Sequence, residues 1–394
     1  MQRNRQAPVI YNILCSVLTA GTMFLFAAPS LAEGLASTNP PPIPRLPQEE
    51  AIAAAPLPYR EEPVVFDNPA ASGVRLAGTL TLPNGNGPFA AVLLIAGSGR
   101  NTRDEPIHKS DGTESGHKPM LVLADALARQ GYAVLRYDKR GAGKSSGNYD
   151  AATMMDFLSD ARAALAWLGS RPEIDKARLA IVGHSEGAEI GALMAADDPA
   201  ITGVVMMAGF AEPENLLVAE QIRRMDIANG KPPAEAAQTY ALNLKLFDAI
   251  ATAKDQAEGE ARVVKILATA NPPPDNAEIH QTLLFARLPM MRFLLGYNPE
   301  ETLEKIRVPV LALGGTKDLI ALTDINQPAL RKALARDADV TIVEMPGLNH
   351  FFQHAQTGLP SEMSGIEETL APEVMATIIP WLAKHMVPEA RTSR

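Results

Sequence analysis

Short apolar runs alternate with longer amphipathic stretches along most of this chain. The first two runs, residues 64–66 and 74–82, are separated by Asn-Pro and Ser-Gly pairs and predict an antiparallel strand pair. Further strands are expected at residues 90–95, 132–137, 178–182, 201–207, 308–313 and 340–343, and helices at 117–130, 151–168, 324–336 and 372–385. Because nearly continuous apolar strands between helices are typical of strands buried on both faces, the pattern favours an α/β fold with a parallel sheet between two helical layers.

The alternation stops between residues 211 and 307. This stretch shows helical patterns broken by proline-rich turns, and it contains no convincing strand. We therefore expect a helical insertion at 211–307, with the core formed by residues 61–210 and 308–390.

The amino-terminal segment has a different texture. Arg3 and Arg5 precede a mostly apolar run, and small residues at 30 and 32 mark a cleavage point before Glu33. Residues 1–32 are therefore interpreted as a secretory signal peptide, which predicts an exported protein, periplasmic or secreted. The run is also long enough for an uncleaved membrane anchor. Residues 33–60 are rich in proline and alanine and predict an extended leader outside the core.

Cysteine content and charge restrict the classes of function. The one cysteine, Cys15, lies in the proposed signal peptide, so the mature chain is expected to have neither disulfides nor thiol chemistry. The formal net charge is −9, and cleavage would remove two arginines and no acidic residues. With no basic stretch beyond isolated pairs, we expect no nucleic-acid partner and no stable membrane insertion after cleavage.

Residues 179–193 propose a nucleophile. A short apolar run leads into Gly183-His-Ser185-Glu-Gly187, and a small-residue helical pattern follows. This strand–turn–helix context is the one in which G-x-S-x-G presents a serine at a sharp turn, where both glycines avoid clashes of the crowded backbone. Ser185 is therefore the candidate nucleophile.

A serine hydroxyl needs a positioned base, normally an imidazole oriented by a carboxylate. His350, in the loop after the last predicted strand, is the candidate base, with His354 as the fallback. Asp318, in the loop after the strand at 308–313, is the candidate acid, and Asp324, which we interpret as a helix cap, ranks second. His184, inside the turn itself, is expected to point the wrong way to serve its neighbour.

Two glycine-rich loops are candidate binding elements. The loop at 96–99 offers the N–H of Ser98 to an oxyanion, together with the N–H of Glu186 after the nucleophile. The loop at 138–147 contains Gly-Lys-Ser but has Asp138 where a phosphate-binding loop requires glycine. A structural role is expected there, with a local ion pair between Asp138 and Arg140.

Together these motifs resemble those of bacterial α/β-hydrolase-fold esterases, in the branch related to serine aminopeptidases and dienelactone hydrolases. The resemblance covers roughly residues 62–388 and is carried by 96–99, 103–105, 138–145, 183–187, 315–318 and 349–350. It implies an eight-stranded, mostly parallel sheet, a helical cap after strand 6, and carboxylic-ester hydrolysis without a cofactor or metal. Two positions depart from the pattern. Ala96 replaces a frequent histidine brace, and Glu186 puts a carboxylate where leucine or methionine is common.

The sequence thus predicts a serine hydrolase for small-molecule carboxylic esters with small to medium acyl chains. Apolar residues between 283 and 295 either line an apolar pocket or pack within the cap. A serine peptidase or aminopeptidase remains open, because the same groups cleave amides, as does a catalytically silent binding protein of this fold. The sequence does not indicate an oligomeric state.

Overall fold

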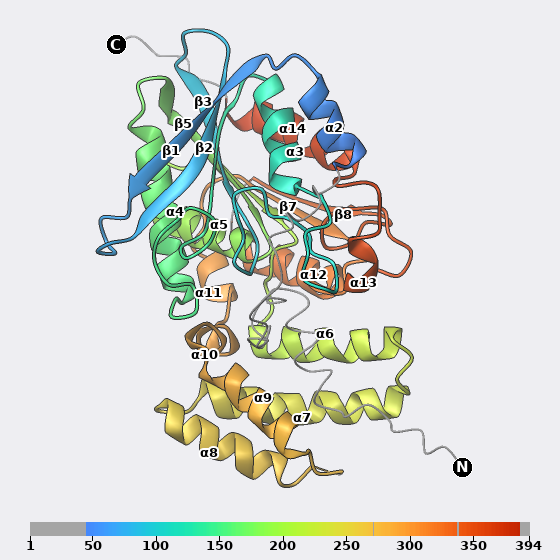
Figure 1. Ribbon diagram of the computed structural model, residues 1–394. Helices are drawn as coiled ribbons and strands as arrows, with labels where there is room; N and C mark the ends of the chain where they lie inside the picture. The colour runs from blue at the N-terminus through green and yellow to red at the C-terminus, as the bar shows by residue number, and fades with distance from the viewer. Residues whose placement is uncertain (1–44, 271, 337–338, 387–394) are drawn as a thin grey trace, which may run out of the picture.

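The computed structural model describes residues 45–270, 272–336 and 339–386. These residues contain an eight-stranded sheet in the order β1-β2-β4-β3-β5-β6-β7-β8, as expected for the α/β-hydrolase fold (Figure 1). The pairs β1/β2 and β2/β4 are antiparallel, and every other neighbouring pair is parallel. The strands are β1 (Tyr59–Asp67), β2 (Arg75–Pro83), β3 (Phe89–Ile95), β4 (Ala133–Tyr137), β5 (Ile174–His184), β6 (Gly203–Met207), β7 (Val310–Gly315) and β8 (Val340–Met345).

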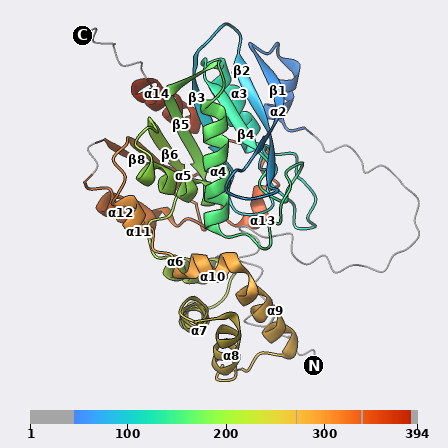
Figure 2. The ribbon, with the colours of Figure 1, turned by 90° about the vertical axis from the view of Figure 1, so that its left-hand side faces the viewer.

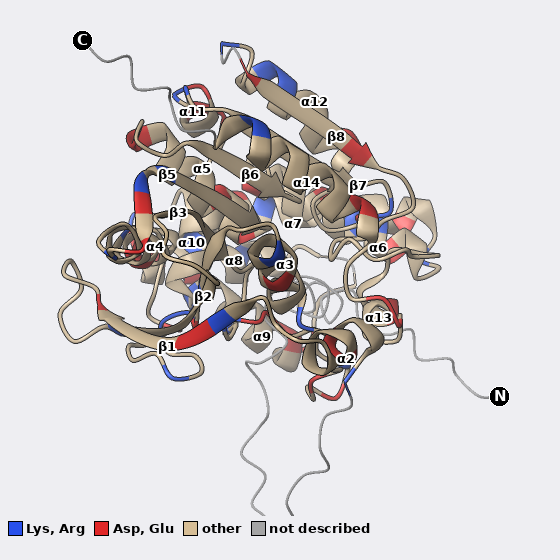
Figure 3. Ribbon diagram, turned by 90° about the horizontal axis from the view of Figure 1, so that it is seen from above, with Lys and Arg blue, Asp and Glu red and all other residues tan. Residues whose placement is uncertain are grey.

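Helices cover both faces of the sheet. Successive side chains of a strand point to opposite faces, and in the central strands both sets are apolar and need to be buried. Ala91, Leu93 and Ile95 of β3 pack in one apolar cluster with α4 (Met154–Gly169), α5 (Glu186–Asp197) and α12 (Thr323–Ala333). Val92 and Leu94 pack in the other with α3 (Pro119–Arg129) and α14 (Pro372–His385). The central strands are largely free of charged residues in the view from above (Figure 3). The short helix α13 (Pro360–Met363) lies in the loop before α14.

The interpretation of residues 33–60 as an extended leader is wrong for its described part. Pro47–Ala54 form α2, with a proline at the start of the helix, where its missing N–H costs nothing. Glu49 is buried and accepts hydrogen bonds from the backbone N–H of Lys118 (2.9 Å) and the hydroxyl of Thr369 (2.8 Å). Tertiary contacts thus hold α2 against the core, and β1 begins before the leader was expected to end. The proposed signal peptide lies outside the described residues.

The described residues between β6 and β7 are mainly helical, in agreement with the helical patterns of this stretch. The helices are α6 (Glu214–Ala228), α7 (Pro233–Ala251), α8 (Gln256–Leu267), α9 (Asn276–Arg287), α10 (Pro289–Gly296) and α11 (Glu300–Leu303). Helices α6 to α10 gather on one side of the sheet-containing part (Figures 1 and 2). They surround their own apolar cluster, which includes Ile222, Phe247, Val263 and Phe285. In the part of the chain that the structure describes, no helix is both long and apolar enough for a membrane span.

Candidate active site

Ser185 occupies the turn between β5 and α5 with a positive φ, at φ 54° and ψ −121°, a strained backbone conformation for a residue other than glycine. A Cβ at Gly183 would lie 2.0 Å from the carbonyl oxygen of Gly187, and one at Gly187 would lie 2.1 Å from that of Ile95. Both glycines are therefore required by the close backbone approach, as the motif predicted. The turn places Ser185 at the carboxyl edge of the sheet, where the loops after β3, β7 and β8 also meet.

Asp318 and His350 are brought together by the loops that follow the neighbouring strands β7 and β8. His350 Nδ1 donates to Asp318 Oδ2 at 2.9 Å, and both side chains are buried. Asp318 Oδ1 accepts the backbone N–H groups of Ile320 (2.7 Å) and Ala321 (2.8 Å). Burial opposes the ionised form of Asp318, but its contact with His350 and these two backbone hydrogen bonds together outweigh burial and lower the pKa of the carboxyl. With Nδ1 engaged, Nε2 of His350 is the ring nitrogen left for proton transfer.

The two second-ranked residues are engaged elsewhere. Asp324 binds the guanidinium of Arg224 at 2.8 and 3.0 Å. His354 Nδ1 donates to Glu368 at 2.9 Å, and its other ring nitrogen lies 3.2 Å from Glu373. Asp324 and His354 therefore do not form a pair like that of Asp318 and His350.

The loop after β3 presents one backbone donor to the site. The N–H of Gly97 donates to Glu105 Oε1 (2.6 Å), and that of Gly99 donates to the hydroxyl of Tyr149 (2.9 Å). The N–H of Ser98, between them, makes no hydrogen bond within the described residues. As the first residue of α5, Glu186 likewise has an N–H with no acceptor inside its helix. Ser98 and Glu186 line one cavity together with Ser185.

Glu105 and His184 form a brace that the sequence analysis did not find. His184 Nδ1 donates to Glu105 Oε1 (2.8 Å), and His184 Nε2 donates to the backbone carbonyl of His350 (2.9 Å). His184 is fully buried, which opposes its charged form, but the carboxylate of Glu105, the carbonyl of His350 and a further nearby carboxylate together outweigh burial and raise its pKa. Glu105 also holds Gly97, so the brace joins the loops after β3 and β8. In the sequence, Glu105 stands out only as part of the run 103–105, which carries the resemblance to esterases and does not indicate a contact with His184.

Replacing Glu105 by glutamine is expected to destabilise the protein by about 1.5–3 kcal/mol at low pH, because His184 loses a buried charged partner. The raised pKa means that this contribution is complete below about pH 6.5 and disappears as the pH rises through the folded-state pKa of His184. Urea unfolding at several pH values measures the difference from the wild type. Glu367→Gln, at an exposed position, is the control. A difference that grows toward alkaline pH contradicts the brace.

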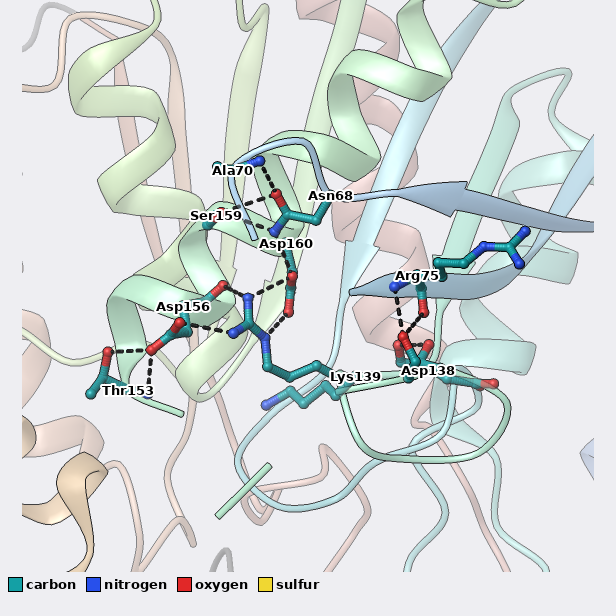
Figure 4. A network of polar contacts seen from close by, with 12 residues as sticks. Asn68, Ala70, Arg75, Asp138, Lys139, Thr153, Asp156, Ser159 and Asp160 are labelled. Atoms are coloured by element: carbon teal, nitrogen blue, oxygen red, sulfur yellow. Dashed lines mark hydrogen bonds and ion pairs between the residues drawn. The ribbon is translucent and has the colours of Figure 1, made fainter. Parts of the chain in front are cut away.

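The predicted ion pair between Asp138 and Arg140 is wrong. Asp138 instead binds Arg103, at 2.8 Å to the guanidinium, and accepts the backbone N–H of Lys144. Arg140 instead binds Asp156 (2.8 Å) and Asp160 (2.6 Å) of α4, and Figure 4 labels these two aspartates. The reason is the fold of the loop. Gly143 packs over Asp138, where a Cβ would lie 2.5 Å from Oδ2, so the carboxylate faces into the loop and away from Arg140.

Lys139, from the same loop, neutralises the unusual carboxylate beside the nucleophile. Its Nζ binds Glu186 Oε1 and donates to the carbonyl oxygen of Gly97 at 2.5 Å. Both charged side chains are only 3% exposed, so the pair is shielded from solvent. The negative charge that Glu186 was expected to place near an oxyanion is therefore paired. The loop was expected to be structural, and it also reaches the site.

A cavity beside Ser185, with an empty volume of about 1030 Å³ that includes open solvent, lies between the sheet edge and the inserted helices. The inserted helices contribute mainly apolar residues to its wall: Leu217, Val218, Phe285, Leu288, Met290, Met291, Leu294 and Leu295. The predicted pocket-lining segment at 283–295 thus does contribute to the cavity. Among the described residues, no group of three or more His, Cys, Asp or Glu side chains could hold a metal ion.

The fold and the site place this protein in the class of α/β-hydrolase-fold proteins. The chain belongs to the X-Pro dipeptidyl-peptidase (S15) family, whose model matches residues 72–328, a range that includes Ser185 and Asp318 and ends before His350. The expected resemblance to bacterial α/β-hydrolase-fold esterases is confirmed by the relatives.

One curated relative is esterase EstD of Thermotoga maritima, 26% identical over 294 residues that cover 75% of this chain. The match spans 62% of EstD, less than two thirds of that relative's length. The solved structure of an esterase from Pyrococcus furiosus is 17% identical, with a TM-score of 0.51, and the match covers 84% of this chain and 93% of that one. The α/β-hydrolase GrgF from Penicillium is 16% identical, with a TM-score of 0.51, 83% of this chain and 99% of that one being covered. At these identities, the two structures support the fold alone.

Proposed function

We propose that this protein is a serine hydrolase that cleaves carboxylic esters of small to medium acyl chains. The observation that carries the proposal is the buried hydrogen bond between Asp318 and His350. These residues lie in the loops after the adjacent strands β7 and β8, at the same carboxyl edge of the sheet as the turn that holds Ser185 in a strained conformation. These are the acid, base and nucleophile of acyl transfer, in the chain order of α/β-hydrolases. The mainly apolar cavity and the esterase relative EstD favour an ester substrate.

The reaction proceeds in two halves. His350 takes the hydroxyl proton as Ser185 attacks the ester carbonyl, and the N–H groups of Ser98 and Glu186 stabilise the oxyanion. The protonated His350 then donates its proton to the leaving alcohol. Water, deprotonated by the same histidine, attacks the acyl-enzyme and releases the acid. Asp318 orients the imidazole and stabilises its charged form.

The inserted helices act as a cap in this proposal. Helices α6, α9 and α10 supply one wall of the cavity while the sheet edge supplies the nucleophile. Selection among acyl chains therefore depends on the apolar side chains of this wall.

We also propose that residues 1–32 direct export of the protein.

Active-site labelling tests the proposal. A fluorophosphonate probe is expected to add once per chain, at Ser185, as located by mass spectrometry of peptides. Ser185→Ala should take no label, whereas Ser170→Ala, at an exposed position, should label like the wild type. Heat denaturation should abolish labelling. A native wild-type protein that takes no label would favour a catalytically silent binding protein.

Peptide hydrolysis is the second candidate, because the family match is to X-Pro dipeptidyl-peptidases. The same triad and oxyanion donors serve amides, so geometry alone does not separate the two reactions. We propose esters as the preferred class. Comparison of a p-nitrophenyl ester series with aminoacyl- and X-Pro-p-nitroanilides measures the preference. A higher kcat/KM for the anilides would reverse the assignment.

A further inference from the structure

The histidine loop, residues 349–353, is held in shape by its first and last residues. The side chains of Asn349 and Gln353 are fully buried. Asn349 Oδ1 accepts the backbone N–H of Gln353 (3.0 Å), and Asn349 Nδ2 donates to Gln353 Oε1 (3.0 Å). The N–H of Asn349 also donates to the carbonyl oxygen of Gln353 (2.9 Å). These bonds close a short ring that contains His350 and fix the backbone from which its imidazole extends.

This ring is tied to the α13–α14 loop, residues 364–371. Gln353 Nε2 donates to the carbonyl oxygen of Glu368 (2.8 Å), and the N–H of Ala371 donates to that of Phe352 (2.9 Å). Phe352 has a positive φ of 59°, and such a conformation persists in a residue other than glycine only where the surroundings impose it. The position of the histidine loop therefore depends on the α13–α14 loop.

The α13–α14 loop is in turn bound by α2, which lies beside α3 in Figure 1. Gln48 Oε1 accepts the backbone N–H groups of Thr369 (2.6 Å) and Leu370 (3.0 Å). Gln48 Nε2 donates to the carbonyl oxygen of Leu370 (2.9 Å). Glu49 accepts the hydroxyl of Thr369, and Ile52 packs against the apolar cluster that contains Leu370. One side chain of α2 thus satisfies three backbone groups of this loop.

We propose that α2 is a clasp that positions His350 for proton transfer, with Gln48 and Gln353 as the positioning residues. This inference rests on the proposed ester hydrolysis, in which His350 is the base, and it gives the amino-terminal helix a part in ordering the active site. The contacts run from α2 through the α13–α14 loop to the histidine loop. Neither α2 nor the α13–α14 loop lines the cavity, so the clasp acts on the base and not on the substrate.

Gln48→Met tests the clasp, because methionine is similar in length to glutamine but makes none of its three hydrogen bonds. We expect kcat for p-nitrophenyl butyrate to fall by about three- to tenfold, with KM changed by less than about twofold. The reason is that His350 serves both acylation and deacylation while the cavity is untouched. Glu50→Met places the same side chain at an exposed position of α2 and should behave like the wild type. An unchanged kcat in Gln48→Met overturns the proposal.

Fluorophosphonate labelling separates positioning from loss of folded protein. A misplaced base lowers the rate at which Ser185 reacts, whereas partial unfolding lowers the amount of protein that reacts. Gln48→Met should therefore take one label per chain, as the wild type does, at a rate reduced in proportion to kcat. A label stoichiometry that falls with kcat at an unchanged rate overturns the positioning role.

A second variant tests the route of the effect. Gln353→Met removes the link between the histidine loop and Glu368 and should lower kcat by about tenfold or more. In Gln48→Met/Gln353→Met, the loss should be clearly smaller than the product of the two single losses, since both positions act on the same loop. Losses that multiply show that α2 does not act through Gln353 and contradict the clasp.

Proton NMR makes the result independent of turnover. The Nδ1 proton of His350, which is hydrogen-bonded to Asp318, is expected to give a downfield signal that is assigned by its absence in His350→Ala. The signal should shift or exchange faster in Gln48→Met and stay unchanged in Glu50→Met. If esters are cleaved but the signal does not respond, the clasp is wrong and the proposed function stands. If the signal responds but no ester is cleaved and Ser185 takes no label, the hydrolase proposal is wrong while α2 still positions His350.

Discussion

Ser185→Ala is expected to lower kcat for p-nitrophenyl butyrate by about 10⁴- to 10⁶-fold. The reason is that the acyl-enzyme cannot form without the hydroxyl, and only the oxyanion donors and substrate positioning remain. The fold should be unaffected, because alanine is smaller than serine and the serine side chain makes no capping hydrogen bond at the start of α5. Steady-state kinetics and urea unfolding measure the two effects. Wild-type-like turnover in this variant is incompatible with the proposed mechanism.

The double variant Ser185→Ala/His350→Ala sharpens the same test. Nucleophile and base act as one unit, so removing the base as well is expected to cost little beyond the loss of the serine. Prior treatment of each preparation with a fluorophosphonate removes traces of wild-type enzyme that would mask the residual rate. Losses that multiply would show that Ser185 and His350 act in separate steps.

Local pattern was enough to predict the sheet and the turn at Ser185. Strands buried on both faces are apolar throughout, and the helix Pro372–His385 was predicted with the bounds that the structure shows. The glycines at 183 and 187 follow from contacts within the same few residues and their nearest strand, so a short motif identifies them. The chain order of Ser185, Asp318 and His350 then limited the choice of acid and base.

Partners that come from distant parts of the chain were not predictable in this way. Glu105 and His184 are 79 positions apart, and nothing local to either shows that they meet. Asp138 and Arg140 are close in sequence and opposite in charge, yet the turn of the loop directs them to Arg103 and to α4. The helix α2 was missed for a similar reason, since its stability comes from contacts of Gln48 and Glu49 with residues near 369.

Lys139→Met is expected to reduce the free energy of unfolding by about 3–5 kcal/mol, because the carboxylate of Glu186 would remain buried without its cation. The carbonyl of Gly97 would lose a donor in the same change, so the loop that carries Ser98 should also be less well held. Urea unfolding measures the stability. We expect kcat/KM to fall as well, since an unpaired negative charge beside the N–H of Glu186 opposes a developing oxyanion.

Removing both charges distinguishes loss of the pair from loss of packing. Lys139→Met/Glu186→Met deletes the cation and the carboxylate together, and apolar replacement of a whole buried pair is often neutral or stabilising. The double variant should therefore be more stable than Lys139→Met alone, with a coupling energy of about 2 kcal/mol or more between the two positions. Its backbone N–H at position 186 remains, so ester hydrolysis should recover in part. If the two destabilisations simply add, Lys139 supports the loop through Gly97 and not through Glu186.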